Sequence, residues 1–320
     1  MKINSDIIVI GCGVSGLSCG IILQEYGYKT SIVATKLPPS TTSDIAPAYW
    51  YPYKVNPPER VLKWGEISYK YFTKLSSLNG SGVSMTNLIK LYDSEVAIPQ
   101  WAEITNKFRI LSKSELPDGY QFGFSSEVPL IETPIYMYYL FNRYMKTEGR
   151  VIKLKDDLKS IGRYTKNHKI LVNCTGLGSL NLFNDNRMYP IRGQLVRVTN
   201  PGIRNIYSDQ DGHLSLSYIV PRSGDCILGG TADDNNWDTG VDNKISRIIL
   251  ANCKKIVPGL EDSVILEHKV GLRPGRDNVR LESELYKDCQ IIHNYGHGGA
   301  GFTLSWGCAK EVKNIIADLI

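Results

Sequence analysis

The chain has 320 residues, 42% of them apolar and 22% charged, which is the balance of a globular protein with a sizeable core. The 37 Lys and Arg against 32 Asp and Glu give a net charge of +5, and no run of five basic residues indicates a nucleic-acid interface or a polybasic membrane anchor. The seven scattered cysteines form no CxxC pair and no apolar run approaches the roughly 18 residues of a membrane span, so we expect a cytoplasmic protein without a metal site, a disulfide framework or membrane contact.

The chain opens on a strand, a glycine-rich turn and a helix. Residues 6–10 form a β-branched and apolar run typical of a buried parallel strand, and residues 11–16 (Gly-Cys-Gly-Val-Ser-Gly) stand between it and a helical pattern. In such a turn Gly11 allows the tight bend, Gly13 lets the backbone approach a pyrophosphate, and Gly16 lets the helix pack on the strand. The helix N-terminus then offers its free N–H groups to a phosphate.

A second strand over residues 29–34 completes a pattern that strongly predicts a dinucleotide site, since a GxGxxG turn alone occurs in many folds. A carboxylate is expected at the end of this strand, where it binds the ribose hydroxyls. Thr35 stands there instead, and its hydroxyl can still hydrogen-bond the ribose, although more weakly. Lys36 follows and could accommodate a 2′-phosphate, so NADP stays open at this point.

Six later blocks occur in order along the chain. They are residues 40–46 (Ser-Thr-Thr-Ser-Asp-Ile-Ala), 172–176 (Val-Asn-Cys-Thr-Gly), 190–194 (Pro-Ile-Arg-Gly-Gln), 228–231 (Leu-Gly-Gly-Thr), 270–274 (Val-Gly-Leu-Arg-Pro) and 293–301 (His-Asn-Tyr-Gly-His-Gly-Gly-Ala-Gly). With these blocks the sequence resembles the D-amino-acid oxidase and D-aspartate oxidase family along nearly its whole length. The resemblance implies FAD as the cofactor.

The last of these blocks is a second glycine-rich turn followed by a helix. Residues 296–301 contain four glycines, and apolar residues recur at helical spacing over residues 302–320. Reduced flavin is anionic at its N1–C2=O edge, and a helix N-terminus placed there stabilises that charge. By resemblance, Thr303 would hydrogen-bond this edge. An NADP enzyme has no need of such a feature.

The resemblance distributes the cofactor site over both glycine-rich turns and the segments between them. The residues that it implies are Gly11, Gly13, Val14, Ser15, Gly16, Thr35, Lys36, Thr41, Thr42, Ser43, Ala48, Leu158, Thr175, Gly176, Gly298, Gly299, Ala300, Gly301, Phe302 and Thr303.

Oxidation of an α-amino acid requires a group that holds its carboxylate. Arg273 lies in a segment of Gly and Pro, and a planar guanidinium binds both carboxylate oxygens at once. Arg276 and Arg280 fit surface salt bridges better. By resemblance, Arg273 and Tyr218 bind the substrate carboxylate, and the Gly299 carbonyl accepts a hydrogen bond from the amine. No general base is needed if the amine binds neutral and hydride moves directly, although a base role for one loop histidine stays open.

The substrate side chain is expected to meet aromatic residues. Tyr49, Tyr51 and Tyr53 stand where the family's side-chain pocket begins, and period-two spacing would point them the same way. Leu214 occupies the place of a lid tyrosine that mammalian D-amino-acid oxidases carry four residues before Tyr218. These features predict a pocket with phenol hydroxyls.

Three further residues bear on the charge of the substrate. Ala232, Asp233 and Asp234 stand where D-aspartate oxidases place an arginine for the acidic side chain. Two carboxylates near the pocket mouth would repel acidic substrates and favour neutral or basic ones, although they could equally be solvated turn residues.

The order of these segments implies an α/β fold in which a Rossmann-type FAD-binding domain is interleaved with a mostly antiparallel substrate-binding domain. We expect residues 1–75, 145–190 and 278–320 in the first domain, and 76–144 and 191–277 in the second. The leading hypothesis is an oxidase that converts a free D-amino acid and oxygen to a 2-oxo acid, ammonia and hydrogen peroxide. Two alternatives are a tailoring enzyme or dehydrogenase of the same fold, and a flavin-binding protein without turnover. A homodimer stays open.

Overall fold

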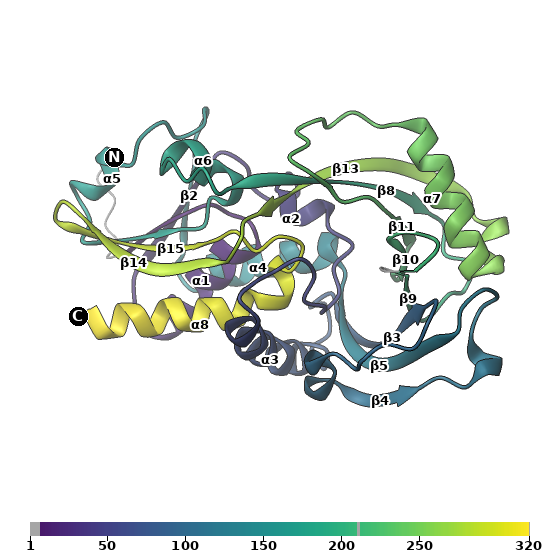
Figure 1. The fold of residues 1–320 in the computed structure, drawn as a ribbon. Helices are drawn as coiled ribbons and strands as arrows, with labels where there is room; N and C mark the ends of the chain where they lie inside the picture. The colour runs from purple at the N-terminus through teal and green to yellow at the C-terminus, as the bar shows by residue number, and fades with distance from the viewer. Residues whose placement is uncertain (1–6, 210–211, 320) are drawn as a thin grey trace.

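Two β-sheets lie side by side in the computed structural model, which describes residues 7–209 and 212–319 (Figure 1). Sheet A has six strands in the order β14-β15-β7-β1-β2-β6. Sheet B has nine, in the order β12-β8-β11-β10-β9-β3-β5-β4, with β13 also paired to β8. The α/β fold class predicted from the sequence is therefore confirmed. Residue 6, the first residue of the predicted opening strand, lies outside the described residues.

Sheet A is parallel except for its edge strand β14. Its strands are β1 (Ile7–Ile10), β2 (Thr30–Ala34), β6 (Arg150–Lys153), β7 (Ile170–Asn173), β14 (Arg280–Tyr286) and β15 (Cys289–Tyr295). The central strands are apolar at nearly every position because both faces of the sheet are covered. One face packs on α1 (Val14–Glu25) and α8 (Gly301–Leu319), which also pack on each other. Apolar residues of the 154–183 segment cover the other face.

Sheet B is antiparallel apart from the β3–β9 pair. Its strands are β3 (Val83–Tyr92), β4 (Asn106–Ile110), β5 (Phe122–Ile131), β8 (Tyr189–Val198), β9 (Ile206–Asp209), β10 (Ser217–Pro221), β11 (Cys226–Gly229), β12 (Asp233–Asp234) and β13 (Ile265–Gly275). The amphipathic helix α7 (Asn243–Ile256) packs on β8, β10 and β11 and closes a second apolar core (Figure 1).

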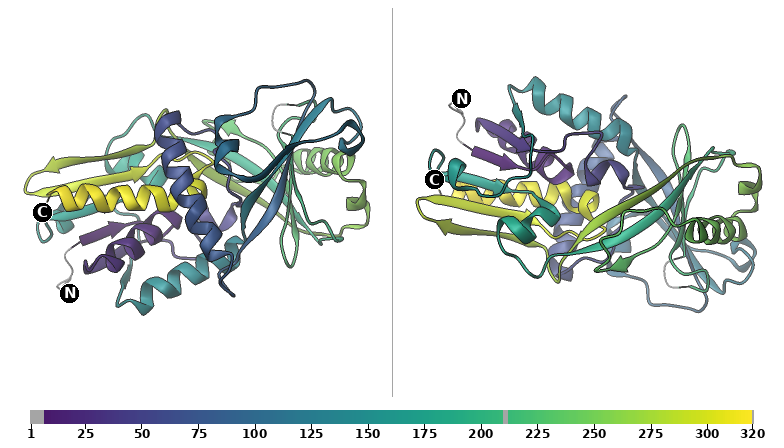
Figure 2. Two further views of the ribbon diagram at one scale, coloured as in Figure 1. Left: turned by 90° about the horizontal axis from the view of Figure 1, so that it is seen from below. Right: turned by 90° about the horizontal axis from the view of Figure 1, so that it is seen from above.

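A long helix bridges the helical layer of sheet A and the strands of sheet B. The long helix α3 (Pro58–Leu75) crosses α8, as the left view of Figure 2 shows, and it also packs on β3 and β5. The others are α2 (Thr42–Ile45), α4 (Thr133–Lys146), α5 (Gly162–Thr165) and α6 (Ser179–Leu182), with 3-10 turns η1 (Gln100–Ile104), η2 (Lys113–Glu115), η3 (Gly176–Gly178) and η4 (Pro258–Asp262). No helix among the described residues is both long and apolar enough to cross a bilayer.

The sheets draw on the chain in alternation. Sheet A takes its strands from residues 7–34, 150–173 and 280–295, whereas sheet B takes its strands from residues 83–131 and 189–275. We keep the two-domain division with the boundaries given above as a proposal, because strand membership alone does not define where a domain begins.

Candidate active site

A cavity of about 940 Å³ lies between the carboxyl ends of the parallel strands of sheet A and the facing strands of sheet B. Ligands of open α/β sheets bind at this edge, and the volume is at the upper end of the roughly 300–1,000 Å³ usual for small-molecule sites. We call the side lined by sheet A, its following turns and the start of α8 the cofactor half. The substrate half is lined by β8, β9, β10 and β13 and by residues 49–53.

Almost all of the residues predicted for the cofactor line this cavity. They are Gly11, Gly13, Val14, Ser15, Thr35, Lys36, Thr41, Thr42, Ser43, Ala48, Leu158, Thr175, Gly176, Gly298, Gly299, Gly301, Phe302 and Thr303. Gly16 and Ala300 lie outside the lining, and Ala300 is fully buried.

The three glycines of the first turn face different neighbours. Gly11 has φ +110°, and a Cβ there would clash with the Cys174 carbonyl at the end of β7. A Cβ at Gly16 would clash with the carbonyl of Gly11, so both of these glycines are needed for packing. Gly13 differs, because its Cβ would meet only Ser43 Oγ, at 3.1 Å. Gly13 is therefore the glycine that leaves open space for a ligand.

The threonine-rich loop is fixed against the start of α1. The Val14 N–H donates to Ser43 Oγ (3.0 Å), which joins the loop to the first turn of the helix. Asp44 Oδ2 accepts hydrogen bonds from the Thr41 N–H (2.8 Å) and from the Thr41 hydroxyl (2.6 Å). The next N–H groups of α1, beginning with that of Ser15, have no intrahelical acceptor and remain for an anion.

The start of α8 closes the cofactor half. The Gly298 N–H donates to the Pro274 carbonyl (2.8 Å), and Gly299 packs so tightly on the Tyr53 ring that a Cβ would clash. The Thr303 hydroxyl donates to the Tyr51 carbonyl (2.9 Å) and accepts from the Tyr51 N–H (3.0 Å). Its hydrogen is therefore not available for the flavin contact expected from the sequence. The Thr303 N–H, in the first turn of the helix, is the group that can meet a ligand.

Arg273 and Tyr218 come from two different strands and reach the cavity over glycines. A Cβ at Gly193, on β8, would lie 2.6 Å from Arg273 Cζ. Gly229 pairs with Tyr218 in the β10–β11 register, and a Cβ there would overlap the Tyr218 ring. The blocks at 190–194 and 228–231 thus supply the space that these two side chains occupy.

The Tyr218 hydroxyl is buried beside the Arg273 side chain, which can only donate, and its O–H has no acceptor among the described residues. Burial raises the pKa of Tyr218, and the neighbouring Arg273 guanidinium opposes that rise, so the phenol stays protonated. Arg273 Nη1 donates to the Thr231 carbonyl (3.0 Å), and its Cζ lies 6.0 Å from the centre of the Tyr53 ring. A guanidinium fork and an unpaired O–H donor at one place suit a carboxylate.

The side-chain wall of the substrate half is aromatic and polar. Tyr49 and Tyr51 stack with ring centres 6.0 Å apart, and both line the cavity together with Tyr53. Tyr49 forms an isolated β-bridge to Leu130. Ser208 joins this wall, accepts a hydrogen bond from the buried Lys90 ammonium (3.2 Å) and hydrogen-bonds Tyr49. Lys90 Nζ also lies 4.8 Å from the centre of the Tyr51 ring.

Leu214 and Ala232 do not line the cavity, contrary to the prediction for the substrate pocket. Leu214 turns into the core beneath α7, where its N–H donates to Asp209 Oδ2 (3.0 Å). Ser215 and Leu216 both have positive φ, and this turn brings Leu216 to the cavity in place of Leu214. Leu216 lies just before β10, and strand alternation could not have identified it because the positive φ angles interrupt the period-two pattern there.

Asp233 and Asp234 also lie outside the lining. They form the short strand β12, in which Asp233 pairs with the buried Arg192 (3.6 Å) and Asp234 with Lys54 (3.0 Å). The expected repulsion of acidic substrates by these two carboxylates therefore has no source at this site.

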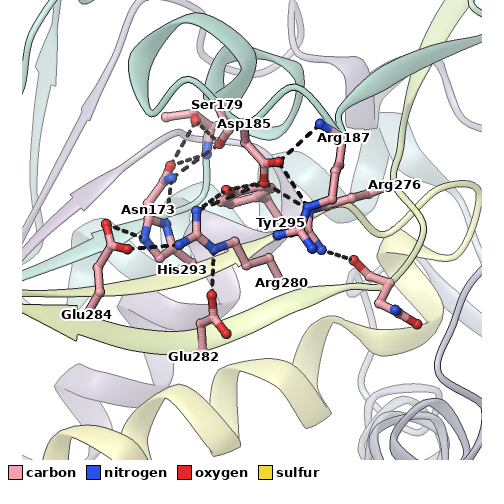
Figure 3. A network of polar contacts seen from close by, with 12 residues as sticks. Asn173, Ser179, Asp185, Arg187, Arg276, Arg280, Glu282, Glu284, His293 and Tyr295 are labelled. Atoms are coloured by element: carbon pink, nitrogen blue, oxygen red, sulfur yellow. Dashed lines mark hydrogen bonds and ion pairs between the residues drawn. The ribbon is translucent and has the colours of Figure 1, made fainter.

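Behind the cavity, a polar network ties β14 and β15 to residues 184–187 (Figure 3). Asp185 Oδ2 accepts from Arg276 Nε (2.9 Å) and from the Tyr295 hydroxyl (2.8 Å), which in turn accepts from Arg280 (2.9 Å). Although burial raises the pKa of Asp185, these partners lower it to about 2. Arg276 is only 6% exposed, so it is a buried ion-pair residue and not the surface arginine expected. The network fixes the chain just after Arg273, at Arg276, and just before the 296–301 turn, at Tyr295.

His297 is the histidine of the cavity. Burial lowers the pKa of His297 to about 4, and its Nε2 lies 3.0 Å from Asn294 Oδ1. At neutral pH the ring is therefore uncharged and weakly basic, which argues against the base role left open by the sequence.

Comparison with known proteins places the chain in context. A sequence profile of the family described as FAD dependent oxidoreductase matches residues 6–315. The D-amino-acid oxidase of Rubrobacter xylanophilus is 42% identical over 97% of this chain and 95% of its own length, and that of Dictyostelium discoideum is 38% identical over 98% and 92%. The crystal structure of glycine oxidase from Geobacillus kaustophilus has the same fold, with a TM-score of 0.82 over 98% of this chain and 95% of that one, at 18% identity.

Proposed function

Because this chain belongs to the family of FAD dependent oxidoreductases, we propose that it oxidises a free D-amino acid with a neutral side chain. The products are the 2-oxo acid, ammonia and, from oxygen, hydrogen peroxide. The observation that carries the proposal is the convergence of the Arg273 guanidinium and the unpaired Tyr218 hydroxyl on one cavity. The similarity to proteins named D-amino-acid oxidase supports this choice of substrate.

The cofactor half suits FAD. The open space at Gly13 and the unpaired N–H groups at the start of α1 fit a pyrophosphate, and the start of α8 fits the anionic edge of a reduced flavin. Gly13, Ser15, Thr42 and the first turn of α8 would hold it. When bound, FAD supplies the two-electron acceptor for the substrate Cα–H bond.

The substrate half orients the amino acid. Arg273 holds both carboxylate oxygens, and the Tyr218 hydroxyl donates a hydrogen bond to one of them while it stays protonated. The Gly299 carbonyl accepts a hydrogen bond from the amine. These three anchors fix the plane of the carboxylate and the position of nitrogen, so the Cα–H bond of one enantiomer faces the cofactor half and that of the other points away from it. Holding the reacting groups in one orientation in this way can supply a large share of the reduction in the activation barrier.

The amine enters already neutral. Among the described lining residues, His297 is the one histidine and Asp157 the one carboxylate, and Asp157 lies in the cofactor half. His297 has its pKa lowered to about 4 by burial, so it does not take the amine proton at neutral pH. The pH dependence of turnover should therefore follow the pKa of the substrate amine itself.

The side-chain preference rests on the composition of the wall. Tyr49, Tyr51, Leu216 and Ser208 offer apolar surface and neutral hydrogen-bonding groups, and no described carboxylate stands there to pair with a basic side chain. The case for basic substrates depended on Asp233 and Asp234, which pair elsewhere. Arg273 is used by the substrate's α-carboxylate, and no other arginine among the described residues lines the cavity to meet an acidic side chain.

A screen of free amino acids of both hands tests the proposal. Neutral D-amino acids should bleach the bound flavin without oxygen and give hydrogen peroxide with it. Bleaching without reoxidation by oxygen would instead support a dehydrogenase. Bleaching by no amino acid of either hand would contradict the proposal and favour a flavin-binding protein without turnover.

A further inference from the structure

One carboxylate lines the cavity among the described residues, and it is Asp157. It lies on the loop that follows β6, beside Thr35 and Lys36 at the end of β2. Thr35 donates its hydroxyl hydrogen to Asp157 Oδ1 at 3.1 Å, although the two residues are 122 positions apart. The side chain takes part in no ion pair within the described chain and remains accessible to solvent.

The topology explains why this loop reaches the end of β2. Strands β2 and β6 are parallel neighbours with Ala34 opposite Lys153, and the Leu154 N–H continues the ladder by donating to the Ala34 carbonyl (2.9 Å). The chain therefore leaves β6 at the same edge of the sheet, directly beside Thr35. An acidic side chain on this loop falls close to the place where dinucleotide-binding folds usually carry their carboxylate on the second strand itself.

We propose that Asp157, oriented by Thr35, is the carboxylate that binds the ribose hydroxyls in the AMP half of FAD. A carboxylate accepts from two vicinal hydroxyls, and the free oxygen of Asp157 is available because Thr35 engages only Oδ1. Thr35 thus becomes a positioning residue, which accounts for its presence where an acid is expected.

The surroundings of Asp157 fit a nucleoside. Leu154, Leu158 and Leu182 line the same cavity and pack against the apolar cluster on the covered face of sheet A. Apolar lining of this kind suits the faces of a base, while the carboxylate suits the ribose hydroxyls. The same negative charge opposes the attraction of a 2′-phosphate by Lys36 and Lys159, which also line the cavity, so it weighs against the NADP alternative.

Cofactor affinity tests this assignment without any turnover. Apoprotein is titrated with FAD while flavin fluorescence is followed, for wild type, Asp157→Asn and the control Asp156→Asn. Asp156 is the exposed neighbouring carboxylate and does not line the cavity. Loss of a charge-assisted pair should weaken FAD binding by about tenfold or more in Asp157→Asn. The control should bind FAD like wild type.

Two further measurements locate the effect. ADP, as a competitor that contains the ribose but no flavin, should lose affinity by a similar factor in Asp157→Asn. The double variant Thr35→Asp with Asp157→Asn returns the carboxylate to β2 and should recover most of the FAD affinity. Unchanged FAD affinity in Asp157→Asn, an equal loss in Asp156→Asn, or an unchanged ADP affinity would overturn the proposal. None of these outcomes depends on which amino acid is oxidised.

Discussion

The cofactor half and the substrate half of the cavity present different chemical groups to a ligand. The cofactor half presents mainly backbone: two helix starts and glycines such as Gly13 at which no Cβ fills the space. The substrate half presents side chains, and Arg273 and Tyr218 reach it only because Gly193 and Gly229 lie under them. The cofactor half therefore depends on the absence of a side chain at a few glycines, whereas the substrate half depends on a few contacts between strands that are distant in sequence.

Gly13→Val breaks the cofactor half and should have the largest effect. The backbone at Gly13 has φ −77°, which valine adopts without strain, so the added methyl groups should act mainly by filling the space of the pyrophosphate. We expect loss of bound FAD with little change in the melting temperature of the apoprotein. Measured flavin content at the wild-type level would show that Gly13 does not face the cofactor.

Gly229→Ala perturbs the substrate half alone. The new methyl group would overlap the Tyr218 ring, so the ring must move away from Arg273. A displacement of about 1 Å at such a site costs on the order of a hundredfold in kcat/KM, and overpacking lowers the free energy of unfolding by about 1–3 kcal/mol. FAD affinity should be unchanged. A variant that keeps wild-type kcat/KM would mean that Tyr218 does not anchor the substrate.

His297 should make the protein less stable in acid. Its pKa in the folded state, about 4, lies below the ordinary value of about 6.5 because burial disfavours the charged ring. The unfolded chain therefore binds a proton first, and stability is lost as pH falls from about 6.5 toward 4, by up to about 3 kcal/mol. Chemical unfolding across this range should show a smaller loss for His297→Gln than for wild type. Parallel curves for the two proteins would exclude this contribution.

Asp233→Asn combined with Asp234→Asn should have the smallest effect. Both carboxylates pair outside the cavity, so the ranking of D-amino acids by kcat/KM is expected to stay as in wild type. The surface pair with Lys54 contributes at most about 1 kcal/mol to stability. A gain in turnover of D-aspartate by the double variant would place these residues near the substrate after all.

The sequence predicts the cofactor half better than the substrate half, for a physical reason. The strand, turn and helix around Gly11 and Gly13 are contiguous, so local spacing is enough to identify them. The position of Leu216 depends on a turn with positive φ, and that of Asp157 depends on the pairing of β2 with β6. No local sequence pattern predicts either of these features. Leu214 was misplaced by that turn. Which group of Thr303 could meet the flavin was also beyond the sequence, because the bond from its hydroxyl to the Tyr51 carbonyl joins residues 252 positions apart.

The most direct test of the account is the rate at which a neutral D-amino acid bleaches the flavin of Arg273→Ala without oxygen. FAD should remain bound, because Arg273 belongs to the substrate half. Loss of one partner of a buried charged pair costs about 2–5 kcal/mol, so bleaching at low substrate should slow by about thirtyfold to several thousandfold. Arg273→Lys, which keeps the charge without the planar fork, should fall in between. Bleaching of Arg273→Ala at the wild-type rate would contradict the assignment of Arg273 as the carboxylate anchor.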